Sequence, residues 1–337
     1  MGERKDRPKV IVIGTGGTIS FDGRHGLDTY EYMEFGTRHD IDTVLTRFPE
    51  LDAIAQIETV SFRTLSSAAV SPCDWIDLVQ KIHDLAEGGG GPDGFVITHG
   101  TATLEETAYF LNLTLKTSIP VVLVGAQRPK NALGSDAGPN LVNAVQVAAS
   151  PEARALGVLV VLNEEIQAAR EVTKTSTHRL ETFRSPDLGM LGYADADGRV
   201  AIYRRPARRY APDCEFDVSG RDGLPRVDIA ATYAGADEAA ISAFVAAGAR
   251  GIVMSSVAPG LVTPQQRDAL IAARSEGVVI VESTRAGSGR VLRRTSMHEQ
   301  GIVAADNLNP QKARVLTMLA LTVTDDPERI QVMFELY

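Results

Sequence analysis

Residues 10–19 read VIVIGTGGTI, a run of four β-branched residues that leads directly into a glycine-rich turn. Three more short apolar runs follow, FVIT at 95–98, VVLV at 121–124 and VLVVL at 158–162. Segments with helical spacing, such as 105–115 and 140–149, separate the later runs. Buried strands that alternate with amphipathic helices are typical of a parallel sheet covered on both faces. The sequence therefore predicts a doubly wound α/β domain.

The composition changes after about residue 192, where a polar stretch rich in glycine, proline and arginine begins. Two units of helix, glycine stop and buried strand then follow, in residues 239–256 and 268–284. A length of 337 residues is compatible with two domains. We therefore expect an N-terminal α/β domain over residues 1–205, a linker over 206–226 and a smaller α/β domain over 227–337.

The overall charge restricts the classes of partner. The chain has 34 Lys+Arg and 43 Asp+Glu, a formal net charge of −9, which argues against nucleic acid or an anionic membrane surface as partner. Two cysteines, Cys73 and Cys214, are too few for a disulfide framework or a metal cluster. The start, MGERKDRPK, has no apolar leader segment, and no stretch reaches the ~18 apolar residues of a membrane helix. These features predict a cytoplasmic protein with no metal.

The turn GTGGT after the first strand is the first candidate site. It lacks the GxGxxG spacing of a dinucleotide loop, and no clear helix opens after it. Thr18 places a hydroxyl at the end of this turn, where a substrate carbonyl can approach the backbone closely. Alternatively, Thr18 only caps the turn.

The stretch HGTATLEET at 99–107 joins a predicted strand to a predicted helix. Thr103 and Glu106 have the spacing of a capping box, which puts Thr101 near the positive end of that helix. Such a position favours an anion or a developing alkoxide. Alternatively, both threonines are only caps. We interpret His99 as a structural hydrogen-bonding residue rather than a base.

Two further motifs follow predicted strands. The first is VGAQRPK at 124–130 with SDAGPNL at 135–141, which again lies between a strand and a helix. The second is REVTKT at 170–175, in which Lys174 lies among small hydroxyl residues. Lys174 is a candidate base or carbonyl polariser, and the alternative is a solvated surface lysine.

Together these motifs carry a family resemblance. TGGTI, HGTxTxEET, VGAxRP with SDAGPNL, and REVTKT occur in this order, and the chain resembles the bacterial-type L-asparaginase/glutaminase family over nearly its whole length. GIVMSS at 251–256 and ESTRAGSGRV at 282–291 match the family's later strands. The resemblance implies a larger N-terminal α/β domain with a parallel or mixed sheet and a smaller C-terminal α/β domain. It also implies a homotetramer built as a dimer of dimers, with no metal or organic cofactor.

The resemblance further implies a hydrolase that converts a side-chain amide of a small-molecule substrate to an acid and ammonia through an acyl-enzyme. The family's nucleophile matches Thr18, its second threonine matches Thr101, and the lysine partner of that threonine matches Lys174. A tyrosine on the loop after the nucleophile assists the reaction. Spacing favours Tyr30 for this role, with Tyr32 as the alternative.

Substrate contacts are expected at five positions. Gly17 and Gly100 lie in the two glycine turns, whose backbone N–H groups are candidates for an oxyanion hole. When the chain is aligned with the family on Trp75, Ser67 matches a family residue that binds the substrate carboxylate. Ala68 stands where the family has a glutamine, and Ala102 stands where it has the aspartate of HGTDT.

Two groups that hold the substrate's α-ammonium in the family are therefore alanine in this chain. Each lost charge-assisted contact costs ~1.5–3 kcal/mol, so both losses weaken asparagine binding by roughly 10²–10⁴-fold. The sequence thus predicts an amide substrate that carries a carboxylate but no free α-ammonium. Candidates are an N-substituted or deaminated amide, a cyclic amide or imide, and a lactone. The alternatives are an ordinary L-asparaginase/glutaminase and a protein that binds an amide or amino-acid derivative without turnover.

The alanine at position 102 also removes the family's acidic partner of Lys174. A lysine without that partner in an apolar pocket has a lower pKa and is a better neutral base.

Overall fold

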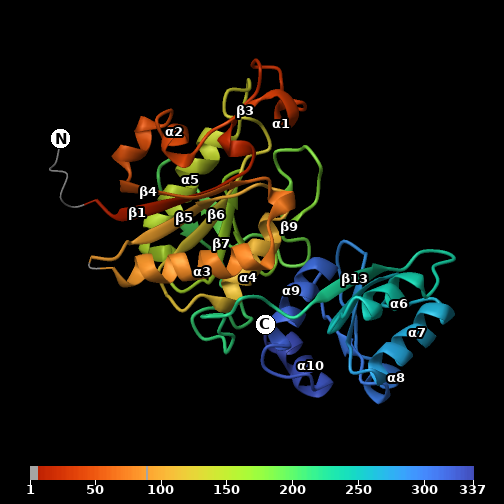
Figure 1. The fold of residues 1–337 in the computed structure, drawn as a ribbon. Helices are drawn as coiled ribbons and strands as arrows, with labels where there is room; N and C mark the ends of the chain where they lie inside the picture. The colour runs from red at the N-terminus through yellow and green to blue at the C-terminus, as the bar shows by residue number, and fades with distance from the viewer. Residues whose placement is uncertain (1–6, 89) are drawn as a thin grey trace. The chain divides into compact units, whose positions relative to one another are not determined.

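A computed structural model describes residues 7–88 and 90–337, and the chain divides into two compact units (Figure 1). The first unit ends at Cys214 and the second begins at Glu215. Residues 203–226, between the last strand of the first unit and the first strand of the second, contain no helix or strand. The boundary thus falls inside the stretch predicted as a linker.

The N-terminal unit is built on one mixed sheet of eight strands, in the order β12-β11-β8-β7-β6-β5-β1-β4. The strands β4, β1, β5, β6 and β7 are parallel to one another, and β8, β11 and β12 add antiparallel pairings at one end. The bounds of the eight strands are β1 (Lys9–Gly16), β4 (Gln56–Leu65), β5 (Gly94–Thr98), β6 (Val121–Val124), β7 (Val158–Leu162), β8 (Glu165–Ala168), β11 (Gly192–Ala194) and β12 (Val200–Ile202). The four apolar runs are β1, β5, β6 and β7, which confirms the predicted α/β fold.

Helices cover both faces of this sheet, as the apolar strands require. Figure 1 shows α2 and α5 on one face and α3 and α4 on the other. Their bounds are α2 (Ile41–Leu45), α3 (Pro72–Glu87), α4 (Leu104–Thr114) and α5 (Ala137–Ala149). The segments with helical spacing at 105–115 and 140–149 thus correspond to α4 and α5.

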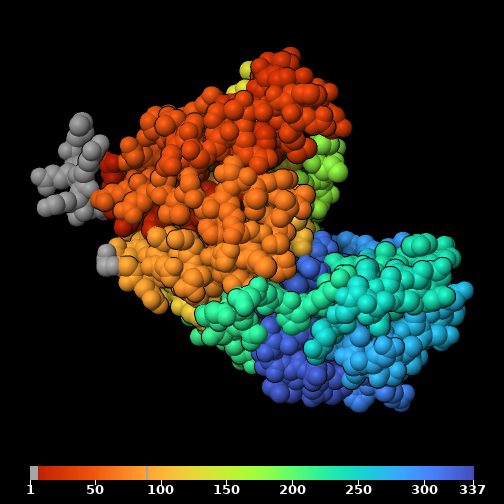
Figure 2. Space-filling view, viewed as in Figure 1, coloured from red at the N-terminus to blue at the C-terminus, as the bar shows by residue number. Residues whose placement is uncertain are grey.

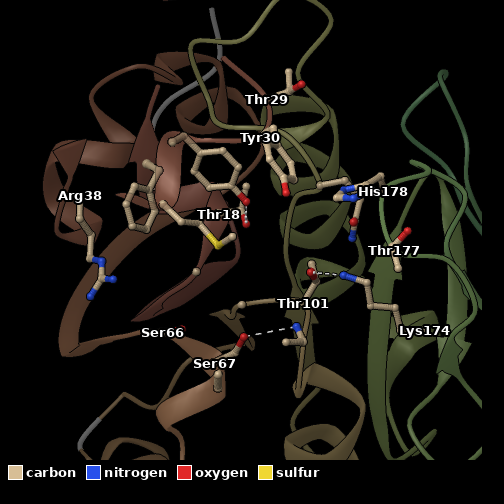
Figure 3. A pocket seen from close by; sticks show the side chains of 18 residues that line it. Thr18, Thr29, Tyr30, Arg38, Ser66, Ser67, Thr101, Lys174, Thr177 and His178 are labelled. Carbon is tan, nitrogen blue, oxygen red and sulfur yellow. Dashed lines mark hydrogen bonds between the residues drawn. The ribbon is translucent and has the colours of Figure 1, made fainter. Parts of the chain in front are cut away.

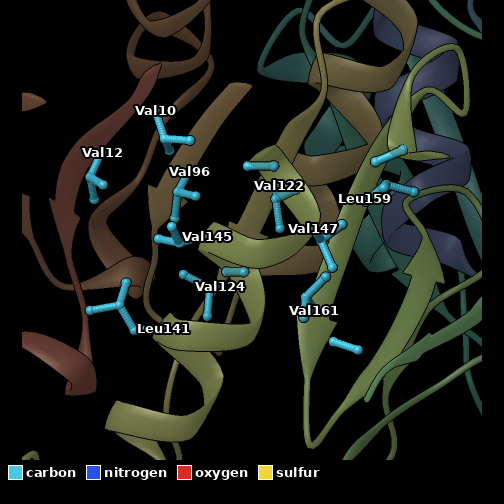
Figure 4. Close-up of a cluster of buried hydrophobic side chains, with 14 of the residues drawn as sticks. Val10, Val12, Val96, Val122, Val124, Leu141, Val145, Val147, Leu159 and Val161 are labelled. Carbon is cyan, nitrogen blue, oxygen red and sulfur yellow. The ribbon is translucent and has the colours of Figure 1, made fainter. Parts of the chain in front are cut away.

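One hydrophobic core lies on the face of the sheet that α2 and α5 cover (Figure 4). Alternate residues of each strand point to this face, so Val10 and Val12 of β1 lie beside Val96 of β5. Leu141 and Val145 of α5 pack on them, and all five side chains are almost completely buried. Burial of a side chain of this size contributes about 1.5–3 kcal/mol, so this layer fixes the positions of the strand ends.

Strand order determines where a ligand binds. The chain leaves β1 for β4 on one side and then returns to β5 on the other side of β1. Open α/β sheets bind ligands outside the carboxyl ends of the strands at such a reversal. The turns after β1 and β5 carry Thr18 and Thr101. Both candidate threonines thus lie at this edge of the sheet.

A loop that follows β1 projects from this edge. It is closed by the strands β2 (Phe21–Asp22) and β3 (Thr37–Arg38), which pair with each other, and it contains the short helix α1 (Tyr32–Phe35). Figure 2 shows this red segment at the top of the N-terminal unit, beside the yellow chain around residue 130. Two hydrogen bonds between Gly23 and the Asn131 side chain tie the segments together.

The C-terminal unit is a four-stranded parallel sheet in the order β13-β14-β15-β16. The strands are β13 (Val227–Ala231), β14 (Gly251–Ser256), β15 (Val279–Thr284) and β16 (Val303–Ala304). The helices are α6 (Ala239–Ala246), α7 (Pro264–Ser275), α8 (Thr295–Glu299), α9 (Pro310–Ala320) and α10 (Pro327–Leu336). Both predicted helix–strand units are present, as α6 with β14 and α7 with β15. Within the described residues, none of the helices has the length and apolar character needed to cross a bilayer.

Candidate active site

The two glycine turns after β1 and β5 touch each other. Gly17 has a φ of +85°, and a β-carbon on it would lie 2.4 Å from the Gly100 backbone. A β-carbon on Gly100 would in turn lie 2.5 Å from Ser67 Oγ. Only glycine fits at both positions, because any side chain would force the turns apart. This close approach brings the segments after β1, β4 and β5 into one pocket.

Thr18 is paired with a tyrosine of the projecting loop. Its Oγ1 lies 2.8 Å from the hydroxyl of Tyr32, at the start of α1. Tyr32 is buried, and its ring meets the ring of Phe21 edge-on at 5.5 Å between centroids. Burial raises the pKa of the Tyr32 phenol, so its hydroxyl stays protonated near neutral pH.

Spacing favoured Tyr30 for this contact, and the structure places Tyr32 there instead. The Tyr30 side chain is 73% exposed and lies at the pocket mouth, where its ring faces His178 at 6.1 Å between centroids. The path of the loop is the reason. Asp28 accepts hydrogen bonds from the backbone of Arg24 and Glu31 and from the Arg24 guanidinium, which turns Tyr32 inward.

Thr101 and Lys174 form a second pair on the opposite wall (Figure 3). Lys174 Nζ donates to Thr101 Oγ1 at 2.7 Å. Lys174 comes from the two-residue strand β9 (Thr173–Lys174), which pairs with β10 (Phe183–Arg184). Burial lowers the pKa of the Lys174 amine, because it removes water from the charged form. Within the described part of the chain, no carboxylate forms an ion pair with the amine that would offset this effect. Lys174 is therefore partly buried and hydrogen-bonded, and the alternative prediction of a solvated surface lysine is wrong.

Ser67 lies between the two turns, in the single helical turn Ser67–Ala69 that follows β4. Its Oγ accepts a hydrogen bond from the backbone N–H of Ala102 at 3.3 Å, and its carbonyl accepts one from Thr103 Oγ1 at 2.7 Å. The predicted capping box is therefore wrong. Thr103 does precede α4, but its hydroxyl is used to hold Ser67 rather than to cap the helix.

Ala68 and Ala102 both line the pocket. Each is exposed, so each presents a methyl group to a space that the substrate would enter. Within the described residues, no aspartate or glutamate side chain lines this pocket. The cavity measures about 380 Å³, and among the described residues that line it there is no acidic partner for an ammonium group.

His99 has the structural role that was predicted for it. Its ring is buried, and burial lowers its pKa to about 4. Because Nδ1 faces the carbonyl of Gly100 at 2.8 Å, that nitrogen carries the proton and donates it. Nε2 then accepts from Thr107 Oγ1 at 3.0 Å, which itself accepts from Trp75 Nε1 at 2.8 Å. This chain of bonds holds the carbonyl of the Gly100 turn.

The third motif supports the site from behind. Asp136 accepts hydrogen bonds from the backbone N–H groups of Gln127 and Arg128, at 2.8 and 3.0 Å. Asn140 donates to the carbonyl of Gly125 and accepts from the backbone of Asn163. These bonds fix the turn after β6, which places Gln127 in the pocket wall.

Sequence reasoning missed several residues of the pocket wall. The pairing of β2 with β3 brings in Phe21 and Arg38, the projecting loop brings in Thr29 and Met33, and the segment after β9 brings in Thr177 and His178. None of these residues belongs to a motif, and β2 and β3 are two residues long each, so the sequence gave no signal that could have found them. Within the described residues, no group of three or more His, Cys, Asp or Glu side chains is arranged to hold a metal ion.

Comparisons with known proteins agree along the chain. Residues 9–208 match the family described as Asparaginase, N-terminal, and residues 226–334 match the Glutaminase/Asparaginase C-terminal domain. L-asparaginase 2 of Bacillus subtilis is 39% identical over 335 residues, covering 99% of this chain and 88% of that protein. The probable periplasmic L-asparaginase of Haemophilus influenzae is 40% identical, covering 98% and 93%. The crystal structure of a probable cytoplasmic L-asparaginase from Campylobacter jejuni superimposes with a TM-score of 0.94 at 39% identity, covering 98% of this chain and all of that one.

Proposed function

Because this chain belongs to the asparaginase family of hydrolases, which act on carbon–nitrogen bonds other than peptide bonds, we propose that Thr18 is its nucleophile and that its substrate is an amide without a free α-ammonium. The observation that carries the proposal is that one pocket contains two threonine hydroxyls, each hydrogen-bonded to its own partner. Thr18 is hydrogen-bonded to Tyr32 at 2.8 Å, and Thr101 to Lys174 at 2.7 Å.

The two pairs suit different tasks in the reaction. Tyr32 has a raised pKa and keeps its proton, so it orients the Thr18 hydroxyl. Lys174 has a lowered pKa and is the candidate base, acting with Thr101. A neutral amine at this point accepts the proton that leaves as the nucleophile attacks.

The reaction proceeds in two steps. Thr18 Oγ1 bonds to the amide carbon, the carbon–nitrogen bond breaks, and the leaving nitrogen takes up a proton to depart as ammonia or an amine. A water molecule then attacks the Thr18 ester, which releases the acid and restores the Thr18 hydroxyl. Backbone N–H groups of the touching turns at Gly17 and Gly100 are the candidates to stabilise the oxyanion in both steps.

The choice of substrate rests on Ala68 and Ala102. An ammonium group placed against these methyls would lose water without gaining a partner, at a cost of several kcal/mol. Ser67 remains as a hydroxyl donor for a carboxylate. The proposed substrate is therefore an amide with a carboxylate and no ammonium nearby.

Ordinary L-asparaginase or glutaminase activity is the second candidate. The names of similar proteins favour it, since the curated relatives at 39–40% identity are named L-asparaginase or glutaminase-asparaginase. In that case the ammonium of asparagine is held by groups other than positions 68 and 102.

Product release from a panel of amides, imides and lactones tests the proposal, with each compound compared between the natural protein and Thr18→Ala. We expect turnover of amides that carry a carboxylate and no ammonium, and its loss in Thr18→Ala. Full turnover by Thr18→Ala would disprove the nucleophile. Tight ligand binding without turnover by either protein would instead support a binding protein. The dimer of dimers stays a prediction. The cytoplasmic location does too, because similar proteins are named both cytoplasmic and periplasmic.

A further inference from the structure

We propose that Arg38 binds a carboxylate of the substrate, and that the substrates are monoamides of dicarboxylic acids, compounds with one amide, one carboxylate and no ammonium. This inference rests on the proposed amide hydrolysis at Thr18 and adds to it a specificity residue and a substrate class. It follows from two features of the pocket, the unused hydrogen-bond donors on one wall and the distribution of charge.

Arg38 is held in place before any ligand binds. It stands opposite Phe21 in the β2–β3 pair, and its guanidinium carbon lies 4.9 Å from the centroid of the Phe21 ring. Nη1 donates to the carbonyl of Thr64 at 2.9 Å. A guanidinium fixed by a ring face and a carbonyl loses little freedom on binding, so it suits planar recognition of a carboxylate.

The remaining donors of Arg38 have no acceptor. Among the described residues, the bond to Thr64 uses Nη1 only, and no carboxylate forms an ion pair with the guanidinium. Nε and Nη2 are therefore available as a two-pronged donor, the geometry that a carboxylate accepts.

Ser67 offers a third donor close by in the chain. Its Oγ accepts from the backbone of Ala102, so the hydroxyl proton is directed elsewhere, and none of the described residues accepts it. Thr64, which holds Arg38, comes three residues before Ser67. Because Arg38 and Ser67 both line the pocket, each offers a donor to an anionic group of a bound substrate.

The charge of the pocket points the same way. Arg38 and Lys174 line it from opposite sides, with Thr18 and Thr101 between them (Figure 3), and the described residues add no carboxylate to its wall. Asp136, whose charge acts on Tyr32, already accepts hydrogen bonds from two backbone N–H groups. A substrate ammonium would meet the Arg38 cation here, whereas a carboxylate would meet complementary charge. The amide end is then left for Thr18.

The test compares acids with their neutral esters. The value of kcat/KM is measured for malonamate, succinamate and glutaramate, for the methyl ester of each, and for L-asparagine. The proteins are the natural chain, Arg38→Gln, Arg38→Lys and, as a matched control, Arg63→Gln. Arg63 also stacks on a phenylalanine ring, that of Phe62, but it pairs with Asp74 and Asp77 and does not line the pocket.

We expect the natural protein to prefer one of the monoamide acids over its ester and over L-asparagine. Arg38→Gln should lower kcat/KM for that acid by about 10–100-fold, the cost of one charge-assisted contact, and leave the ester unchanged. For the same acid, kcat/KM of Arg38→Lys should lie between the values of the natural protein and Arg38→Gln. Arg63→Gln should have the kcat/KM of the natural protein. Succinate, as a product of this class, should bind the natural protein and bind Arg38→Gln more weakly in calorimetry.

An equal loss on acid and ester in Arg38→Gln would mean a merely structural role and would overturn the inference. So would a higher kcat/KM for L-asparagine than for every monoamide acid, or equal succinate binding by both proteins. Thr18→Ala separates the two levels of the proposal. If it loses all turnover while Arg38→Gln fails to discriminate, only the role of Arg38 is wrong, and if it keeps turnover the proposed nucleophile fails as well.

Discussion

Lys174 Nζ donates a hydrogen bond to Thr101 Oγ1 at 2.7 Å, and no carboxylate of the described residues forms an ion pair with that amine. Burial without a counter-charge favours the neutral amine, which is the form that accepts a proton. The pair is thus a dyad of hydroxyl and amine. In the family motif HGTDT an aspartate adjoins the threonine, and Ala102 takes its place in this chain.

The pH profile of Ala102→Asp tests the dyad. In the natural protein kcat/KM should rise with pH as Lys174 loses its proton, at a midpoint below the ordinary lysine value of 10.5. A carboxylate at position 102 favours the charged amine and raises the Lys174 pKa, so the rise should move to higher pH. Ala102→Asn, which is similar in size but neutral, is the control and should leave the midpoint in place. A midpoint unchanged by Ala102→Asp would rule out Lys174 as the group that titrates.

Restoring both lost polar groups should move substrate preference toward asparagine. In Ala68→Gln combined with Ala102→Asp, the ammonium of asparagine regains two contacts, so kcat/KM for L-asparagine should rise by up to roughly 10²–10⁴-fold. Ala68→Gln with Ala102→Asn keeps the polarity and omits the charge, and should gain less. A properly folded double variant with no gain would mean that these two alanines do not select against the ammonium.

The loop tyrosines give a matched pair of variants. Tyr32→Phe keeps the buried ring against Phe21 and removes only the hydroxyl that bonds to Thr18. Because Tyr32 orients the Thr18 hydroxyl, and a misplaced reacting group can cost ~10²-fold in rate, we expect kcat to fall by about that factor. Tyr30→Phe, at the pocket mouth, should change kcat little. Steady-state kinetics on one substrate decides between them, and a larger loss in Tyr30→Phe would mean that the loop rearranges when substrate binds.

Much of the fold was predictable because the burial of a strand or helix determines which of its positions are apolar. Strands covered on both faces, such as β6, have apolar residues at every position, so the run VVLV gives the strand its bounds. The positions of Thr18, Thr101 and Lys174 in the site were also predictable, because each lies in a motif directly after a strand or turn. Strand order then gathers the ends of β1 and β5 at one edge.

The rest of the site depends on contacts between distant parts of the chain. Tyr30 and Tyr32 differ by two positions, and only the bonds of Asp28 within the loop decide which one faces Thr18. Arg38 reaches the pocket through the pairing of two-residue strands, whose sequences carry no periodic signal. The hydroxyl of Thr103 had two available partners, the helix end and Ser67, and tertiary packing determined the choice.

The histidine behind the site should make stability depend on pH. His99 has a pKa of about 4 in the folded protein, against about 6.5 in an unfolded chain. As pH falls from about 6.5 to 4, the unfolded chain takes up a proton that the folded ring refuses, so the free energy of unfolding decreases. The shift corresponds to about 3 kcal/mol across that range.

His99→Gln removes this titration, so the difference between the natural protein and the variant isolates it from other ionising groups. Denaturant unfolding at intervals between pH 7 and pH 4 should give the natural protein the steeper decline. The variant should also be less active at pH 7, because Thr107 and the carbonyl of Gly100 lose the ring that connects them. Equal slopes for the two proteins would mean that His99 is protonated alike in the folded and unfolded states, and that the bond network does not hold a neutral ring.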